Sequence, residues 1–128
     1  MAHVEPEVDW GDKSCWENVY EPSSDTFFLC DGIAALQDRI KNCSVILEVG
    51  SGSGYATAYT SRLLRSVGKI SFHFATDINR ACCTQTRDLC ERNGVIVGPF
   101  CDCFAAHFRG PIDVIIFNPP YVDTPDDE

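Results

Sequence analysis

The sequence predicts an α/β fold in which a parallel sheet carries helices on both faces. Helical and strand-like patterns alternate along the chain, in the order helix, strand, helix, strand, helix, strand, strand. Alternation of this kind needs crossover connections, which make neighbouring strands parallel and place the helices against the sheet. With 128 residues, the chain has room for one domain. We expect this domain over residues 19–128, after a loosely ordered N-terminal arm of residues 1–18.

The first half of the chain predicts two helices with a strand between them. Ser23 or Ser24 can cap a helix that starts near Asp25. The apolar residues of this helix recur at helical spacing: Leu29, Ile33, Leu36 and Ile40. A short apolar strand follows at residues 45–49, and a glycine-rich loop at 50–54 leads into the second helix. Gly68 ends that helix, whose apolar stripe consists of Tyr55, Tyr59, Leu63 and Val67.

The second half predicts three strands and one helix. Residues 70–76 alternate between apolar and polar side chains, which is typical of a strand. Asn79 can cap a helix that ends at Asn93, with Gly94 as the first residue beyond it. Residues 95–97 and 112–117 are the third and fourth strand candidates.

Charge and hydropathy exclude several classes of protein. The formal net charge is −9, with both ends acidic and residues 32–118 close to neutral. Nucleic-acid binders usually carry a basic stripe, and the sequence has none, so we do not expect tight duplex binding. No apolar run approaches the roughly 20 residues of a membrane span, and the N-terminus lacks a signal-peptide pattern. We therefore expect a cytoplasmic protein, with the nucleus as a second location and no membrane partner.

The eight cysteines do not predict a metal site or a disulfide framework. Structural zinc sites usually pair their ligands as C-x-x-C, and the chain has no such pair. Disulfide frameworks belong to secreted domains. We expect reduced cysteines that pack as small apolar side chains.

A glycine loop follows the first predicted strand, with an acid two residues before it. Gly50, Gly52 and Gly54 allow a tight turn and close approach of a ligand. The pyrophosphate of a dinucleotide is anionic, whereas Glu48 at this loop suits a ligand that carries an ammonium group. S-adenosylmethionine (SAM) is such a ligand. The alternative is a flexible Gly/Ser turn without a ligand.

Two further acids follow predicted strands. Asp77 comes directly after residues 70–76, where nucleotide-binding α/β folds place an acid that accepts hydrogen bonds from ribose hydroxyls. Asp102 follows the third strand and could accept a hydrogen bond from an adenine amino group. For each acid the alternative is a solvated turn residue.

A tetrapeptide of unusual chemistry follows the fourth strand, at residues 118–121. Pro119 and Pro120 fix the backbone and remove two N–H donors, which leaves carbonyl oxygens and the Asn118 side-chain oxygen facing a ligand. Two convergent acceptors can hold a planar amino group by its two N–H donors, and Tyr121 can stack on that group. The alternative is a proline-stiffened strand exit. The position at the carboxyl end of a strand favours ligand binding.

These residues resemble the amino-methylating branch of the class I SAM-dependent methyltransferases. The closer resemblance is to the eukaryotic HemK-like enzymes, which methylate a glutamine side-chain amide in a class I translation release factor. It covers roughly residues 19–125, and four segments carry it: residues 20–27, 47–54, 76–79 and 117–122. The resemblance implies a Rossmann-like sheet and a heterodimer with a small zinc-binding activator subunit. Because the family's sheet continues past the tetrapeptide and this sequence ends at Glu128, we expect the last strands to be missing.

The resemblance also implies a role for each matching residue. Tyr20 and Thr26 would close over SAM, and Glu48 and Gly50 would hold its methionine portion. The full set of implied cofactor-binding residues is Tyr20, Thr26, Glu48, Gly50, Gly52, Gly54, Asp77, Asp102, Cys103 and Asn118. The implied catalytic residues are Asn118, Pro119 and Tyr121, and Pro120 joins them in binding the acceptor amide.

Other functions fit parts of the pattern. The same tetrapeptide would serve a histone lysine or DNA adenine methyltransferase, although the net charge opposes binding to DNA. A truncated module that binds SAM without activity is a third possibility. A nicotinamide oxidoreductase would leave the tetrapeptide unexplained.

Overall fold

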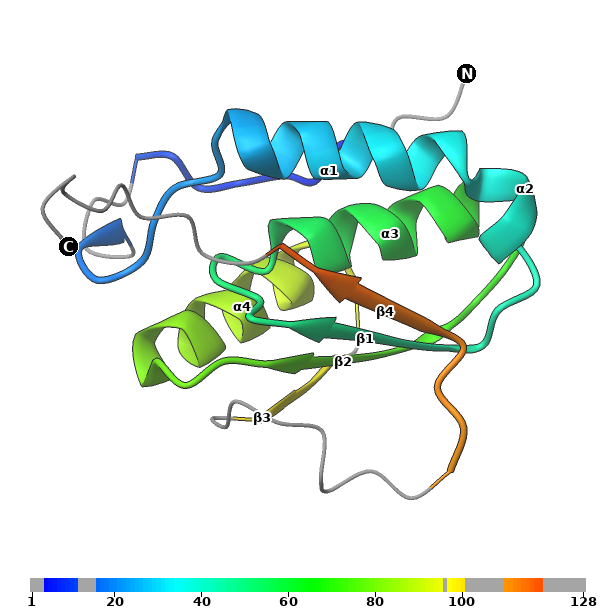
Figure 1. Ribbon diagram of the computed structural model, residues 1–128. Coiled ribbons are helices and arrows are strands. Elements are labelled where there is room, and N and C mark those ends of the chain that lie inside the picture. The colour runs from blue at the N-terminus through cyan, green and yellow to red at the C-terminus, as the bar shows by residue number, and fades with distance from the viewer. Residues whose placement is uncertain (1–3, 12–15, 96, 101–109, 119–128) are drawn as a thin grey trace, which may run out of the picture.

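The computed structural model describes residues 4–11, 16–95, 97–100 and 110–118 (Figure 1). Helices and strands alternate within these ranges as the sequence predicts. The elements are α1 (Ser24–Ala35), α2 (Gln37–Ile40), β1 (Val45–Val49), α3 (Tyr55–Ser66), β2 (Phe72–Thr76), α4 (Arg80–Arg92), β3 (Val97–Phe100) and β4 (Val114–Phe117). No described helix has the length and apolar character that crossing a membrane requires.

The first predicted helix is interrupted, because the chain leaves the α conformation at Leu36. The Leu36 N–H donates to the carbonyls of both Gly32 and Ile33, at 3.2 and 3.0 Å. The shorter bond spans three residues rather than four and tightens the last turn of α1. A separate turn of helix, α2, then follows. Spacing alone did not reveal this break, since Leu36 and Ile40 keep the helical period across it.

Helix α4 has the predicted boundaries. Asn79 caps it, and its side-chain oxygen accepts a hydrogen bond from the Ala81 N–H at 2.9 Å. Gly94 has φ +69°, the left-handed conformation expected beyond a helix end. The strands begin later than the patterns indicated, since β2 starts at Phe72 and β4 at Val114, and β3 starts at Val97 rather than Val95.

The four strands form one parallel sheet in the order β3-β2-β1-β4. Val49 pairs with Thr76 on one side and with Phe117 on the other. The carboxyl ends of β1, β2 and β4 therefore meet at one edge of the sheet, where the predicted site residues lie. The parallel α/β fold is confirmed.

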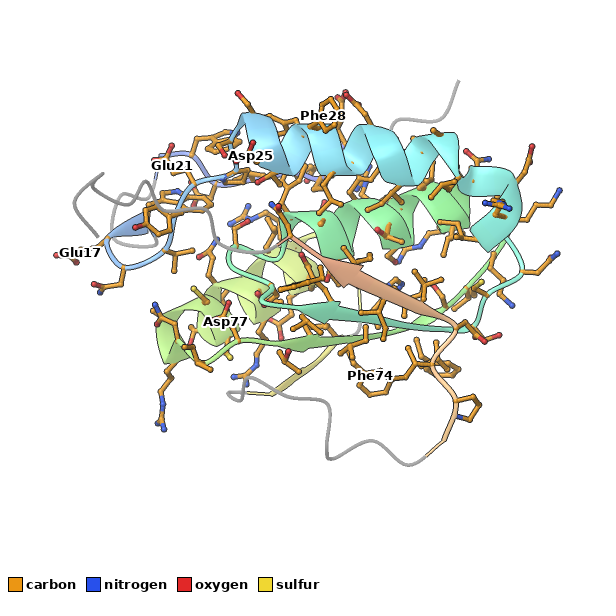
Figure 2. The ribbon with its side chains drawn as sticks, viewed as in Figure 1. Glu17, Glu21, Asp25, Phe28, Phe74 and Asp77 are labelled. Atoms are coloured by element: carbon orange, nitrogen blue, oxygen red, sulfur yellow. The ribbon has the colours of Figure 1, made fainter. Side chains whose placement is uncertain are left out.

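The described helices cover one face of the sheet. The connections β1–α3–β2 and β2–α4–β3 run in the same direction, and right-handed crossovers then put α3 and α4 on the same face. Helix α1 packs on α3 (Figure 1). On the other face, Phe72 is 67% exposed, and Phe74 lies on the side of the sheet away from the helices (Figure 2). A helix on that face would come from the β3–β4 connection, most of which lies outside the described residues.

The core lies between the sheet and the helices. Ile46 of β1, Ile116 of β4, Leu64 of α3 and Leu89 of α4 are buried there together. The five described cysteines are thiols, and four of them are buried. Burial raises the pKa of the Cys90 thiol to about 12, so it packs as a neutral small side chain.

The N-terminal arm is held against the end of α4, chiefly by the side chain of Asn93. Asn93 accepts a hydrogen bond from the Glu7 N–H at 2.7 Å and donates one to the Glu7 carbonyl at 2.9 Å. Val4 and Val8 pack against the core, and Arg92 lies 3.6 Å from Asp9. Residues 4–11 thus have a defined place on the domain.

Candidate functional site

The glycine loop joins β1 to α3 and adopts the left-handed conformation at all three glycines. The φ angles are +71° at Gly50, +56° at Gly52 and +84° at Gly54. A Cβ atom on Gly50 or Gly52 would meet nothing within 4 Å, so the loop presents open space at these two residues. A Cβ atom on Gly54 would lie 2.7 Å from the Thr86 Cα. Gly54 therefore serves the packing of the loop on α4, whereas Gly50 and Gly52 face a possible ligand.

Hydrogen bonds fix this loop to the end of β2. The N–H groups of Gly50 and Ser51 both donate to the Thr76 carbonyl, at 2.8 and 2.9 Å. The Gly52 N–H donates to Asp77 Oδ2 at 2.9 Å, and Asp77 Oδ1 accepts from the Asn79 N–H at 2.9 Å. Each carboxylate oxygen can accept more than one hydrogen bond. Asp77 therefore holds the loop and still has acceptor capacity for a ligand.

Glu48 is the buried acid of the site. Its side chain is 4% exposed, and Oε1 accepts a hydrogen bond from the Thr57 hydroxyl at 2.6 Å. Burial raises the pKa of Glu48 to about 8, and the nearby Asp77 carboxylate adds to the rise, while the Thr57 hydrogen bonds oppose it. A carboxyl group in this state gains from a cation brought next to it, because the cation favours the ionised form.

Two cavities meet at the glycine loop. The smaller, of about 160 Å³, contains Glu48, Thr26 and Asn118 in its walls, and the larger, of about 500 Å³, contains Asp77. Both are lined by Tyr20, Gly50 and Gly52. The structure thus brings together every predicted cofactor-binding residue that it describes except Gly54, whose place is in the packing behind the loop.

Tyr20 and Thr26 come from the segment that enters α1. Tyr20 is 95% exposed, so it stands at the mouth of the two cavities rather than closed over them. The Thr26 hydroxyl accepts a hydrogen bond from the Ser23 N–H at 3.3 Å, as part of a capping box at the start of α1. Thr26 therefore has a structural role in addition to its place in the cavity wall.

Asn118 follows β4 directly and is half-buried beside the loop. The pairing of Val49 with Phe117 places it next to the first glycine of the loop. Five predicted site residues lie outside the described part of the chain: Asp102, Cys103, Pro119, Pro120 and Tyr121.

Sequence reasoning missed several residues of the two cavities. Glu21 and Asp25 line the smaller cavity, and Figure 2 shows them near the start of α1, above the glycine loop. The acidic excess of the first 31 residues was the available signal, but it did not point to a site. Ile78 and Cys82 line the larger cavity. Their closeness to Asp77 in the chain could have identified them.

The comparisons with known proteins agree with the fold. The model of the family "Protein-L-isoaspartate(D-aspartate) O-methyltransferase (PCMT)" matches residues 22–117. The mouse protein "Methyltransferase HEMK2" is 33% identical over 120 residues, which cover 91% of this chain and 55% of the mouse protein. The Schizosaccharomyces pombe "eRF1 methyltransferase catalytic subunit mtq2" is 29% identical over 124 residues, covering 85% of this chain and 53% of that protein.

A more distant relative extends the similarity beyond eukaryotes. A "Putative protein N5-glutamine methyltransferase" of Methanocaldococcus jannaschii is 28% identical over 110 residues, covering 86% of this chain and 51% of that protein. The chain spans about half the length of the curated relatives it matches. The family model covers the sheet from α1 to β4, and the mouse and human relatives are both named HEMK2. The chain therefore belongs to the class I methyltransferases as a HemK-like member.

Proposed function

We propose that this protein transfers a methyl group from SAM to the side-chain amide nitrogen of a glutamine in a translation release factor. The observation that carries the proposal is the position of Asn118 at the end of β4. Its side-chain oxygen can accept hydrogen bonds, and it lies in the wall of the cavity that also contains Glu48. The names of the S. pombe and M. jannaschii relatives, which specify eRF1 and protein glutamine, support this choice of substrate.

The two cavities fit the two ends of SAM. The smaller cavity has three carboxyl groups in its walls, from Glu21, Asp25 and Glu48, and suits the cationic methionine portion. The larger cavity suits the nucleoside, with Asp77 available to the ribose hydroxyls. The open space at Gly50 and Gly52 would let one ligand extend from the smaller cavity into the larger. Asp102 and Cys103 remain the predicted adenine contacts.

The acceptor would be held rather than activated by a strong base. When bound, SAM supplies an electrophilic methyl group. Asn118 Oδ1, together with the predicted Pro119 carbonyl, would accept the two N–H groups of the glutamine amide and fix the direction of its lone pair. These acceptors also stabilise the positive charge that develops on nitrogen as the new C–N bond forms and the C–S bond breaks. The nitrogen then loses one proton to water.

The acidic surroundings argue against a carboxylate acceptor, which the name of the matching family would suggest. Glu21 and Asp25 would repel an isoaspartyl carboxylate that approached the smaller cavity. The same acids would attract a lysine, so a lysine acceptor is the second candidate. Glutamine, lysine and isoaspartyl peptides of otherwise identical sequence separate these possibilities in one methyl-transfer assay.

We further propose a partner, a small zinc-binding activator subunit. The words "catalytic subunit" in the name of the S. pombe relative support a second subunit.

The deciding experiment separates binding of SAM from methyl transfer. Asn118→Ala should lower turnover on the glutamine peptide by roughly a hundredfold while SAM affinity, measured by calorimetry, changes little, because its amide contacts the acceptor. Glu48→Gln should weaken SAM binding itself. Both variants are measured with and without the activator. Equal losses of turnover and SAM affinity in Asn118→Ala would refute the assignment of Asn118 to the acceptor.

A further inference from the structure

A third cavity lies away from the glycine loop, between the N-terminal arm and helices α1 and α3. Its volume is about 430 Å³, within the range of small-molecule sites. Six of its lining residues matter here: Glu5, Trp10, Phe27, Asp31, Tyr55 and Tyr59. It shares Tyr55 with the smaller cofactor cavity and no residue with the larger one.

Four aromatic side chains form its walls. The rings of Phe27 and Tyr55 meet edge to face, with centroids 5.4 Å apart. Trp10 is stacked on Trp16 at 5.7 Å, and the Trp16 indole N–H donates to the Asp9 carbonyl at 3.3 Å. These contacts hold the rings of two different segments in place around one space, so the aromatic faces exist before any ligand arrives.

Two of these four aromatic residues are tyrosines of α3. Tyr55 is 6% exposed and Tyr59 is 9% exposed, so their rings are buried parts of the wall.

The cavity is negatively charged. Glu5 and Asp31 contribute carboxylates to its lining, and no described lysine or arginine lines it. Burial raises the pKa of the Tyr59 hydroxyl, and the negative potential of Asp31 and Glu5 adds to that rise. These carboxylates would repel an anion and attract a cation.

We propose that this cavity binds an alkylated ammonium group. Aromatic faces attract a cation that lies within about 6 Å of the ring centroid, and they favour quaternary and methylated ammonium groups because these shed water easily. The carboxylates of Glu5 and Asp31 supply the neutralising charge. The proposal does not depend on the methyl-transfer activity, since neither Asn118 nor Asp77 lines this cavity.

Choline is a suitable probe, and 3,3-dimethyl-1-butanol is its neutral analogue of nearly identical shape. We expect calorimetry and tryptophan fluorescence of the purified protein to show saturable binding of choline and not of the alcohol. Trp10→Leu should weaken choline binding roughly tenfold, by removing one aromatic face. Phe28→Leu is the matched control, because Phe28 is an exposed aromatic residue on the outer side of α1 (Figure 2).

Charge and location are tested in the same assay. Asp31→Asn should weaken choline binding, whereas Asp38→Asn, at an exposed acid of α2, should not. Binding should persist when S-adenosylhomocysteine saturates the cofactor cavities. Equal binding of choline and the alcohol, absence of choline binding, or displacement of choline by S-adenosylhomocysteine would each overturn the proposal. Unchanged SAM affinity in Trp10→Leu and Asp31→Asn shows that these variants fold.

Discussion

Replacing Glu48 by glutamine should make the free energy of unfolding less sensitive to pH. Burial raises the pKa of Glu48 from 4.5 to about 8 in the folded protein. Between these values the folded state holds a proton that the unfolded state has lost. The free energy of unfolding therefore falls as the pH rises from 4.5 and stops falling above about 8.

The size of the effect follows from the same values. A difference of one bound proton changes the free energy of unfolding by about 1.4 kcal/mol per pH unit. Between pH 6 and pH 9, Glu48 alone should therefore lower the stability of the wild type by about 3 kcal/mol. Glutamine has nearly the same shape and its side-chain oxygen can still accept the hydrogen bond from Thr57, but it has no proton to lose. The variant should lack this fall in stability.

Urea unfolding at several pH values between 6 and 9 measures the effect, with the midpoint and slope fitted at each pH. The other titrating groups are present in both proteins, so the difference between wild type and Glu48→Gln isolates Glu48. Asp38→Asn, which removes an exposed carboxylate, is the matched control and should follow the wild type. The free energies of unfolding of wild type and Glu48→Gln could instead differ by the same amount at every pH. That result would show that the folded protein does not raise the pKa of Glu48.

Three further outcomes are expected. Gly54→Ala should destabilise the protein by more than about 2 kcal/mol in urea unfolding, because residue 54 has a positive φ and the new Cβ would lie 2.7 Å from the Thr86 Cα. Gly68→Ala is the control, with φ +81° and open space around the new Cβ, and should lose only about 1 kcal/mol. Burial, assisted by a nearby arginine, lowers the pKa of His73 to about 4. The free energy of unfolding of the wild type should therefore rise by about 3 kcal/mol between pH 4 and 6.5, and His73→Gln should lack this rise. An equal dependence of the free energy of unfolding on pH in both proteins would contradict this. Asn93→Ala should release the N-terminal arm, because it removes both hydrogen bonds to Glu7. We expect faster proteolysis within residues 4–11 and a free energy of unfolding lower by about 1–3 kcal/mol. An unchanged cleavage rate would contradict this.

The features that the sequence predicted well depend on local chemistry. The capping of α4 by Asn79 and the positive φ angles of the loop glycines follow from what these residue types can do on their own. The meeting of Glu48, Asp77 and Asn118 follows from one topological rule, because parallel strands bring their carboxyl ends to one edge. These parts of the site needed no knowledge of side-chain packing.

The remaining features depend on contacts between segments that are distant in the sequence. Gly54 was assigned to the cofactor because nothing local shows that Thr86, 32 residues later, presses against it. The third cavity requires Trp10 of the arm to meet Tyr59 of α3, and no periodicity connects the two. The raised pKa of Glu48 also depends on its burial under α3, which residue type alone does not reveal.

The position of Asp77 supports the proposal of a ligand with two different ends. Its carboxylate holds the Gly52 N–H and so sets the shape of the loop on which both cavities depend. Its negative charge also contributes to the raised pKa of Glu48. In the proposed complex, a ribose hydrogen-bonded to Asp77 and a cation beside Glu48 would favour the ionised form of Glu48, so that binding would release its proton. A ribose without a cation would leave Glu48 protonated, and a cation without a ribose would leave the larger cavity unfilled. The two acids thus favour the proposed type of ligand, a nucleoside joined to a positively charged chain.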